Sequence, residues 1–150
     1  MALASDDRGV LVPCPSCGKT NRLPYPHLDK TIRCGHCQTT LPPASAPVNA
    51  SSVAAFDALV SQSPVPVLVD FWAPWCGPCR MMAPEVERVA QRNAGRALVV
   101  KVDTDAVPEL GERFIIRSIP TVAVFKRGQL VTRESGARPA ADLEALLARA

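Results

Sequence analysis

The sequence predicts an α/β protein: a mixed central sheet with helices on both faces, preceded by a small module that contains four cysteines. Two observations support this prediction. From residue 51 onward, apolar strand-like runs alternate with segments of helical periodicity. Before that point, two Cys-x-x-Cys pairs are followed by a stretch rich in proline. We therefore expect a four-cysteine module at 1–42, a linker at 43–50 and an α/β domain at 51–150.

The composition allows a packed domain and disfavours several classes of protein. Of the 150 residues, 47% are hydrophobic, which suffices for one domain and a small module. The formal net charge of +3 lacks the basic excess of a nucleic-acid-binding surface. The sequence shows neither a secretory signal nor the roughly eighteen consecutive apolar residues of a membrane span. We therefore expect a cytoplasmic, monomeric protein with no nucleic-acid or membrane partner.

The two N-terminal cysteine pairs have the spacing of a zinc site. Cys14 and Cys17 form the first pair, Cys34 and Cys37 form the second, and sixteen residues separate the pairs. Four thiolates complete a tetrahedral shell, so the predicted zinc is structural and stabilises a module with few apolar residues. Two disulfides or four free thiols are the alternatives, and a reducing compartment disfavours the disulfides.

Two histidines, His27 and His36, lie near these cysteines and are the other candidate ligands. Because four sulfur atoms already fill the coordination shell, we do not expect either histidine to bind the metal.

The first half of the α/β domain fits a β-α-β unit. The linker, which could end in an edge strand, is followed by a serine-capped helix that ends near residue 60. Strand 65–72 is apolar on both faces, as are the central strands of covered sheets. Helix 77–93 carries apolar residues at helical spacing, and Pro84 inside it should cause a kink. Strand 97–102 then completes a right-handed crossover.

The second half predicts a short helix, a hairpin and a last helix. Residues 107–114 have the pattern of a short helix, and 121–125 that of a strand. The turn at 126–129 contains a glycine, so strand 130–135 should return antiparallel to the strand before it. Pro139 suits the first turn of the final helix.

A third Cys-x-x-Cys pair, Cys76 and Cys79, lies where a strand passes into a helix, and such a pair indicates redox chemistry. The positive end of the helix dipole lowers the pKa of a thiol at this position. Cys76 should therefore be the attacking thiol. Cys79 lies on the apolar helix face and should be the less exposed, resolving thiol. A structural or metal-binding pair is the alternative, but two cysteines supply only half of a closed zinc shell.

These residues carry a resemblance to a known family. Val-Asp-Phe-Trp before Trp-Cys-Gly-Pro-Cys, with Ile-Pro-Thr at 119–121, resembles the thioredoxins. Together with the four-cysteine module, the chain resembles the zinc-containing bacterial thioredoxin 2 group. The resemblance implies a zinc-ribbon-like module followed by a domain with the thioredoxin fold. It also implies that the protein is a protein-disulfide reductase that binds no organic cofactor. It also implies oxidised protein disulfides as substrates, and NADPH-dependent thioredoxin reductase as electron donor.

Asp70 and Lys101 are the candidates for proton transfer. Asp70 interrupts an apolar strand, so loss of hydration should raise its pKa. It could accept the proton of Cys79, as the matching residue does in thioredoxins, or it could be a buried structural acid. Lys101 matches a lysine that faces this aspartate in the family, and an ordinary strand-end lysine is the alternative.

Pro120 indicates either the start of a strand or a cis turn. The resemblance implies a cis bond after Ile119 that lies against the disulfide and leaves the backbone of Ile119 free to pair with substrate. It further implies a surface for substrate contact. This surface comprises Trp75, Gly77, Pro78, Ile119 and Gly136.

Two other functions are compatible with parts of the sequence. The chain could be a zinc-ribbon module that binds a partner and is carried on a thioredoxin scaffold, but the intact redox pair disfavours this. An oxidase or isomerase of the same fold is disfavoured by the dipeptide Gly77-Pro78, which matches the reductant type. The zinc could be permanently structural, or it could be released on oxidation as pairs 14/17 and 34/37 close.

Overall fold

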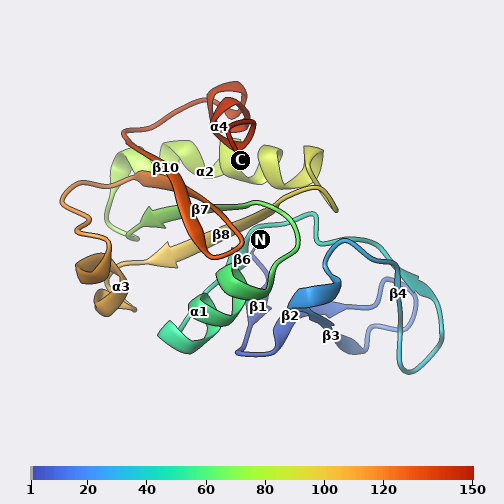
Figure 1. Cartoon of the computed structure of the whole chain (residues 1–150). Helices are drawn as coiled ribbons and strands as arrows, with labels where there is room; N and C mark the ends of the chain where they lie inside the picture. The colour runs from blue at the N-terminus through green and yellow to red at the C-terminus, as the bar shows by residue number, and fades with distance from the viewer. Residues whose placement is uncertain (1) are drawn as a thin grey trace.

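A five-stranded mixed sheet forms the centre of the computed structural model, which describes residues 2–150 (Figure 1). Its strands lie in the order β10-β9-β7-β8-β6. They are β6 (Val48–Asn49), β7 (Val67–Trp72), β8 (Leu98–Asp103), β9 (Thr121–Lys126) and β10 (Gln129–Ser135). β6 and β7 are parallel to β8, whereas β9 is antiparallel to both β7 and β10. The predicted mixed sheet and its C-terminal hairpin are confirmed.

Two helices cover each face of this sheet. They are α1 (Val53–Gln62), α2 (Gly77–Arg92), α3 (Pro108–Arg113) and α4 (Ala140–Leu147). Figure 1 shows α2 and α4 on one face and α1 and α3 on the other. Met82 of α2 and Leu143 of α4 share one apolar cluster, whereas Phe56 of α1 and Leu110 of α3 share another.

The position of β7 at the centre of the sheet explains why its sequence is apolar on both faces. Leu68 packs in the cluster under α2 and α4, while Val67, Val69 and Phe71 pack in the cluster on the opposite face. Because side chains alternate along a strand, Asp70 points to the same face as Leu68, toward α2. The strand thus aims its one carboxylate at the layer that contains the redox helix.

The helix starts follow the local sequence. Ser52 caps α1, since its Oγ accepts a hydrogen bond from the backbone N–H of Ala55 at 3.0 Å. Cys76 caps α2, and its Sγ accepts from the backbone N–H of Cys79 at 3.2 Å. A redox cysteine therefore replaces the usual hydroxyl or carboxylate cap of α2.

The N-terminal module contains strands that the sequence analysis did not foresee. Its elements are β1 (Ala4–Ser5), β2 (Gly9–Pro13), β3 (Thr20–Pro24), a short 3-10 helix (Tyr25–His27), β4 (Ile32–Arg33) and β5 (Thr40–Leu41). The first three strands form one antiparallel sheet, and β4 pairs with β5. A Cβ atom at Gly9 would lie 2.2 Å from the carbonyl oxygen of Leu23, so this close strand contact requires glycine.

The module and the α/β part share one hydrophobic core. Tyr25 and Leu28 of the module belong to the same buried cluster as Phe56 and Leu59 of α1. Residues 51–150 therefore do not have a core separate from that of the module.

The backbone joins the two parts as well. Leu3 pairs in parallel with Val48, donating its N–H to Pro47 at 2.7 Å and accepting from Asn49 at 2.8 Å. The predicted linker thus ends in the edge strand β6, whereas the predicted boundaries at residues 42 and 50 stay predictions.

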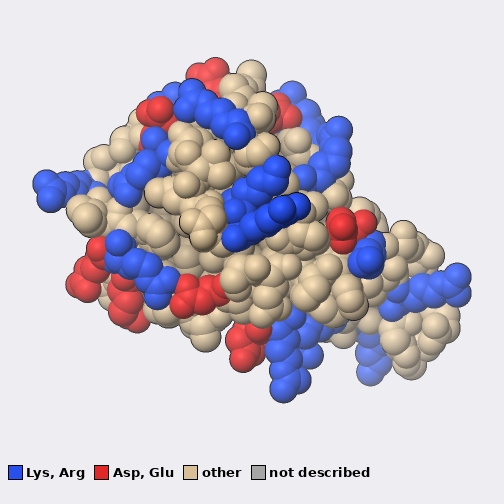
Figure 2. Space-filling view, in the orientation of Figure 1, with Lys and Arg blue, Asp and Glu red and all other residues tan. Residues whose placement is uncertain are grey.

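Among residues 2–150, no helix has both the length and the apolar character needed to cross a membrane. Figure 2 shows acidic and basic side chains interspersed over the face drawn in Figure 1.

Leu28→Ala tests the shared core. Leu28 is buried in the common cluster, so its truncation should lower the free energy of unfolding of the whole chain by about 2–4 kcal/mol. Both tryptophans, Trp72 and Trp75, lie outside the module and report on the α/β part. We therefore expect the urea midpoint measured by tryptophan fluorescence to fall.

Asp29→Ala is the matched control, because Asp29 is the exposed neighbour of Leu28. It should leave the free energy of unfolding within about 0.5 kcal/mol of the original, and the urea midpoint nearly unchanged. An unchanged fluorescence transition in Leu28→Ala, with only the module unfolding earlier, would show that the two parts are energetically separate.

Candidate functional site

The redox pair lies at the junction of β7 and α2 and forms a disulfide. Cys76 and Cys79 are bonded, and their side chains are only 4% and 2% exposed. The expected difference in exposure between the two thiols is therefore small. The chemical difference is clearer, because Cys76 Sγ receives the N–H of Cys79 and lies at the positive end of α2. Both effects stabilise a thiolate on Cys76 in the reduced state.

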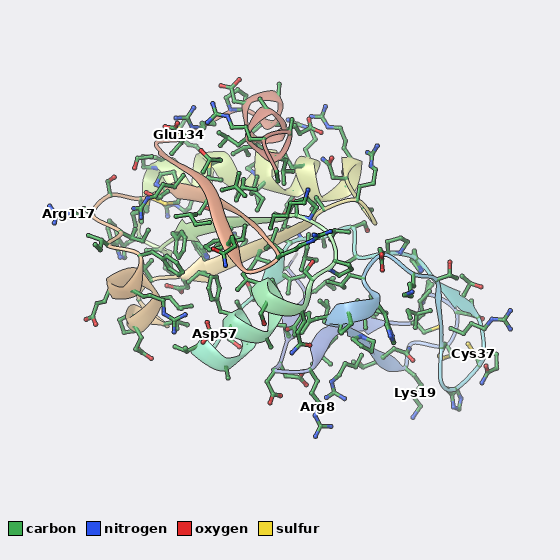
Figure 3. The ribbon with its side chains drawn as sticks, in the orientation of Figure 1. Arg8, Lys19, Cys37, Asp57, Arg117 and Glu134 are labelled. Carbon is green, nitrogen blue, oxygen red and sulfur yellow. A yellow bond between two sulfur atoms is a disulfide. The ribbon has the colours of Figure 1, made fainter. Side chains whose placement is uncertain are left out.

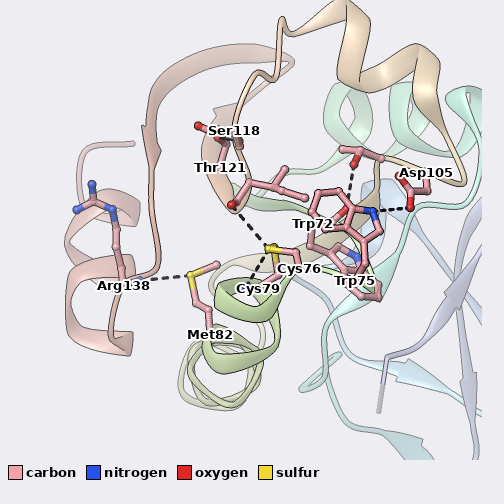
Figure 4. The surroundings of a disulfide bond; sticks show 11 residues. Trp72, Trp75, Cys76, Cys79, Met82, Asp105, Ser118, Thr121 and Arg138 are labelled. Carbon is pink, nitrogen blue, oxygen red and sulfur yellow. Dashed lines mark hydrogen bonds between the residues drawn. A yellow bond between two sulfur atoms is a disulfide. The ribbon is translucent and has the colours of Figure 1, made fainter.

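A loop from the far side of the sheet closes over this disulfide. The Ile119–Pro120 peptide bond is cis, which confirms the cis turn rather than a plain strand start. The carbonyl oxygen of Ile119 lies 3.7 Å from Cys76 Sγ. Thr121 fixes the loop by donating its hydroxyl to the carbonyl of Ser118 at 2.7 Å (Figure 4). The structure thus brings the predicted residues Cys76, Ile119 and Pro120 together.

The predicted contact surface is mostly accessible. Trp75 is 67% exposed, and Pro78 and Gly136 are exposed as well. The indole Nε1 of Trp75 donates to Asp105 Oδ2 at 2.9 Å, which fixes the ring beside the disulfide (Figure 4). Asp105 was not among the site residues predicted from the sequence. The available signal was its place just after β8, at the same edge of the sheet as the end of β7.

Asp70 is a buried acid without a hydrogen bond. Its side chain is 1% exposed, and neither carboxylate oxygen has a partner among the described residues. Burial raises its pKa to about 7, and the nearby Lys101 opposes that rise. Lys101 is directly paired with Asp70 across β7 and β8, and its Nζ lies 4.2 Å from the ring centre of Trp72.

A hollow of about 200 Å³ lies beside Lys101 and Trp72. Its lining mixes apolar residues with the polar residues Asn49, Ser51 and Asp103, and its volume is large enough to hold water. Water there would solvate the ammonium group that faces Asp70. Asp70 makes no direct bond to Cys79 in the described part of the chain, and neither residue lines this hollow. A proton passing between them would need a water that lies between their side chains.

The other four cysteines converge in the N-terminal module. The Sγ atoms of Cys14, Cys17, Cys34 and Cys37 all lie within 4.8 Å of one another. Neither histidine of the described chain belongs to this cluster, as expected.

Backbone amides point at these sulfur atoms. Ser16 donates its N–H to Cys14, and His36 donates its N–H to Cys34, both at 3.4 Å. The N–H of Cys37, the amide of Asn21 and the N–H of His36 together lower the pKa of Cys34 to about 6. Four sulfur donors supported by N–H groups fit a tetrahedral zinc ion.

The two halves of the cluster are built alike. Gly18 has φ +78 and donates its N–H to the backbone carbonyl of Cys14, while Gln38 has φ +65 and donates its N–H to the backbone carbonyl of Cys34. The left-handed turn expected at a glycine therefore occurs at Gly18 in the first half but at Gln38 in the second.

The two cysteine centres are remote from each other. Figure 3 shows Cys37 at one end of the molecule and Arg117, two residues from Ile119, at the other. A direct thiol exchange between the centres of one chain is therefore excluded by position.

A mixed sheet that carries a Cys-x-x-Cys disulfide at a helix N-terminus, with a cis-proline loop against it, defines a thiol–disulfide oxidoreductase. The thioredoxin family model matches residues 47–149. The chain therefore belongs to the thioredoxin family and is a thiol–disulfide oxidoreductase.

Named relatives agree with this assignment. Thioredoxin C-3 of Corynebacterium nephridii is 40% identical over 136 residues, covering 90% of this chain and 91% of that protein. Thioredoxin 1 of Nostoc sp. is 54% identical over 88 residues, covering 59% of this chain and 82% of that protein. The solved thioredoxin of Plasmodium falciparum has a TM-score of 0.62 and 38% identity, covering 67% of this chain and 96% of that one. Since the Corynebacterium match omits only a tenth of the chain, it extends well into the four-cysteine module.

Asp70→Asn tests the cost of the buried carboxyl. In the unfolded chain the group ionises near pH 4, but in the folded chain it keeps its proton until about pH 7. The unfolded state therefore binds fewer protons over this range, and the free energy of unfolding falls as the pH rises from 4 to 7. The variant should be roughly 2–4 kcal/mol more stable than the original at pH 8 and nearly equal to it at pH 4.

The measurement is urea unfolding of the oxidised protein at both pH values.

The same variant also tests the expected role of Asp70 as proton acceptor: its pH–rate profile for disulfide reduction should lose the group that titrates near 7. Equal stability gains at pH 4 and pH 8 would contradict the raised pKa, and an unchanged pH–rate profile would leave Asp70 as a structural acid.

Proposed function

We propose that this protein is a protein-disulfide reductase in which Cys76 attacks and Cys79 resolves. The observation that carries the proposal is the position of Cys76 Sγ, which caps α2, accepts the N–H of Cys79 and lies against the cis-proline loop. A thiolate there is stabilised before substrate arrives. Cys79 lies about one turn further along α2, is bonded to Cys76 and is itself buried.

The reaction balances as two exchanges. The thiolate of Cys76 attacks one sulfur of a substrate disulfide, and the other substrate sulfur leaves as a thiolate. Cys79 gives up its proton, for which Asp70 is the proposed acceptor, and attacks Cys76 in the mixed disulfide. The second substrate thiol leaves, and the Cys76–Cys79 disulfide forms. Two electrons have moved to the substrate. We propose that NADPH-dependent thioredoxin reductase then supplies two electrons that reduce the Cys76–Cys79 disulfide again.

Substrate docking is proposed at the rim of this centre. Trp75 and Pro78 are exposed on one side, and Gly136 is exposed on the other. Among residues 2–150, the backbone N–H of Ile119 has no hydrogen-bond partner. It is therefore free to pair with an extended segment that carries the substrate cysteine. Gly77 lets that segment approach closely, because no atom lies within 4 Å of the Cβ position there.

We further propose one zinc ion in the four-cysteine module, held by Cys14, Cys17, Cys34 and Cys37. The ion would supply folding energy to the module. The residues of the chain arrange the four sulfur atoms and donate N–H groups to them. Membership of the zinc-containing thioredoxin 2 group is part of the same proposal.

A reducing compartment fits both centres, because the thiols must be reduced to bind metal and to act. We therefore propose a cytoplasmic protein. We also propose a monomer without nucleic-acid or membrane partners, in keeping with the net charge of +3 and the mixture of charges over one face (Figure 2). The scaffold alternative is not favoured, because the redox pair is intact.

Cys79→Ser should trap mixed disulfides with substrate proteins, since Cys76 still attacks but nothing resolves the product. Cys76→Ser should trap few. Non-reducing electrophoresis after incubation with oxidised insulin measures the covalent complex. Equal trapping by the two variants would contradict the assigned roles of Cys76 and Cys79.

Peroxide treatment of the zinc-loaded chain tests the four-cysteine centre. We expect one zinc per chain, and its release as the four thiolates oxidise. Cys14 Sγ lies 3.6 Å from Cys37 Sγ, and Cys17 Sγ lies 3.7 Å from Cys34 Sγ, so we expect disulfides between the pairs as well as within them. Because the core is shared, the loss of zinc should lower the unfolding temperature reported by tryptophan fluorescence.

The matched control is the double variant Cys76→Ser, Cys79→Ser, which removes the redox pair from the oxidation signal. Mass spectrometry of peptide fragments identifies the disulfides. Less than one zinc per chain after reconstitution would argue against the metal site. Zinc retained under peroxide would leave it a permanent structural ion.

A further inference from the structure

Ile115 has a backbone conformation that its side chain disfavours. Its φ is +53, in the left-handed region, where a β-branched residue is an outlier. Within the described chain, Gln38 and Arg127 are the other non-glycine residues with positive φ, and neither is β-branched. The Ile115 side chain is also 61% exposed. Holding a large apolar side chain in water by a strained backbone gains nothing for the isolated chain.

The strained conformation is firmly built. The guanidinium of Arg133 on β10 donates to the carbonyl oxygens of Phe114 and Ile115. The N–H of Ile116 bonds to Gly111 at 2.8 Å. The ring of Phe114 packs against those of Phe56 and Phe125, with ring centres 5.5 Å away in each case. These contacts hold the backbone before and after Ile115, and so they hold Ile115 in its conformation.

A surface hollow of about 440 Å³ lies beside Ile115. Small and apolar residues make up most of its lining, with one acid and one base. The lining residues are Thr104, Pro108, Gly111, Glu112, Ile115, Ile116 and Arg117. The opposite charges of Glu112 and Arg117 leave no net charge preference, so apolar contact decides what fits.

The hollow lies between the two segments that border the disulfide. Thr104 adjoins Asp105, which holds the ring of Trp75. Arg117 is two residues from Ile119, whose carbonyl lies against Cys76. Figure 4 shows Asp105, the neighbour of Thr104, and Ser118, the neighbour of Arg117, close to the redox pair. The hollow therefore adjoins the surface where we propose that a substrate disulfide docks.

We propose that Ile115 and the adjoining hollow bind an apolar side chain of the substrate, on the extended segment that carries its reactive cysteine. The inference rests on the proposed reductase function and adds to it a preference for disulfides with apolar neighbours. An extended segment paired with Ile119 advances about 3.3 Å per residue, so its next side chains reach the edge of the redox loop. The strain at Ile115 is then explained, because it presents an apolar surface that only a partner covers.

Two disulfide-linked peptide dimers provide the test. They are identical except that leucine or serine flanks the cysteine, and kcat/KM is measured for each. The original protein should prefer the leucine peptide. Ile115→Gly removes the apolar contact, and Ile115→Asn replaces it with a polar side chain that tolerates the same backbone. Each variant should lower the ratio of kcat/KM for the leucine peptide to kcat/KM for the serine peptide about fivefold. This is the effect expected when apolar contact with part of one isoleucine side chain is lost.

Arg127→Gly is the matched control, since Arg127 has φ +51 in the turn between β9 and β10, outside the docking surface. Both glycine variants relieve a left-handed residue and should raise the unfolding temperature by roughly 2–4 °C. Only the Ile115 variants should change the peptide ratio. A ratio that stays at the original value in either Ile115 variant overturns the proposal. If the original protein reduces neither peptide, the reductase function itself fails, which is a different result.

Discussion

Burial of β7 between two helical layers is the constraint on which the rest of the structure depends. Its alternating side chains fill both apolar clusters, so the strand is fixed in position and direction. The redox cysteines follow its end, where α2 begins. Asp70 lies within it, where burial raises the pKa to about 7. The geometry and the electrostatics of the redox centre therefore both derive from the packing of one strand.

The same chain uses six cysteines in two chemically different settings. Cys76 and Cys79 meet at the N-terminus of a helix, where one thiolate is stabilised and the pair exchanges electrons. The other four meet between short strands, where their sulfur atoms cluster and backbone N–H groups donate to Cys14 and Cys34. The two centres lie at opposite ends of the molecule, yet one hydrophobic core connects the module to the sheet (Figure 3). If the four-cysteine module binds a metal as we propose, the shared core would connect it to the redox centre through stability rather than through contact.

The docking side of the molecule combines fixed and strained features. Trp75 is held by Asp105, and the cis-proline loop is held by Thr121. Ile115 is held in a disfavoured conformation by Arg133. Natural proteins retain such strain mainly where a partner or a reaction requires it. This strain supports our proposal that the exposed apolar side chains near the disulfide form a binding surface.

The sequence by itself determined the local features of this protein. The apolar run of β7, the helical spacing of α2, the Ser52 cap and the two cysteine spacings each depend on residues close together in the chain. Asp70 was identifiable for the same reason, as a charge within an apolar strand. Only the tertiary structure decided the pairing of Leu3 with Val48, the hydrogen bond from Trp75 to Asp105 and the shared core. These contacts join residues distant in sequence, and they form only because the layers pack in one arrangement.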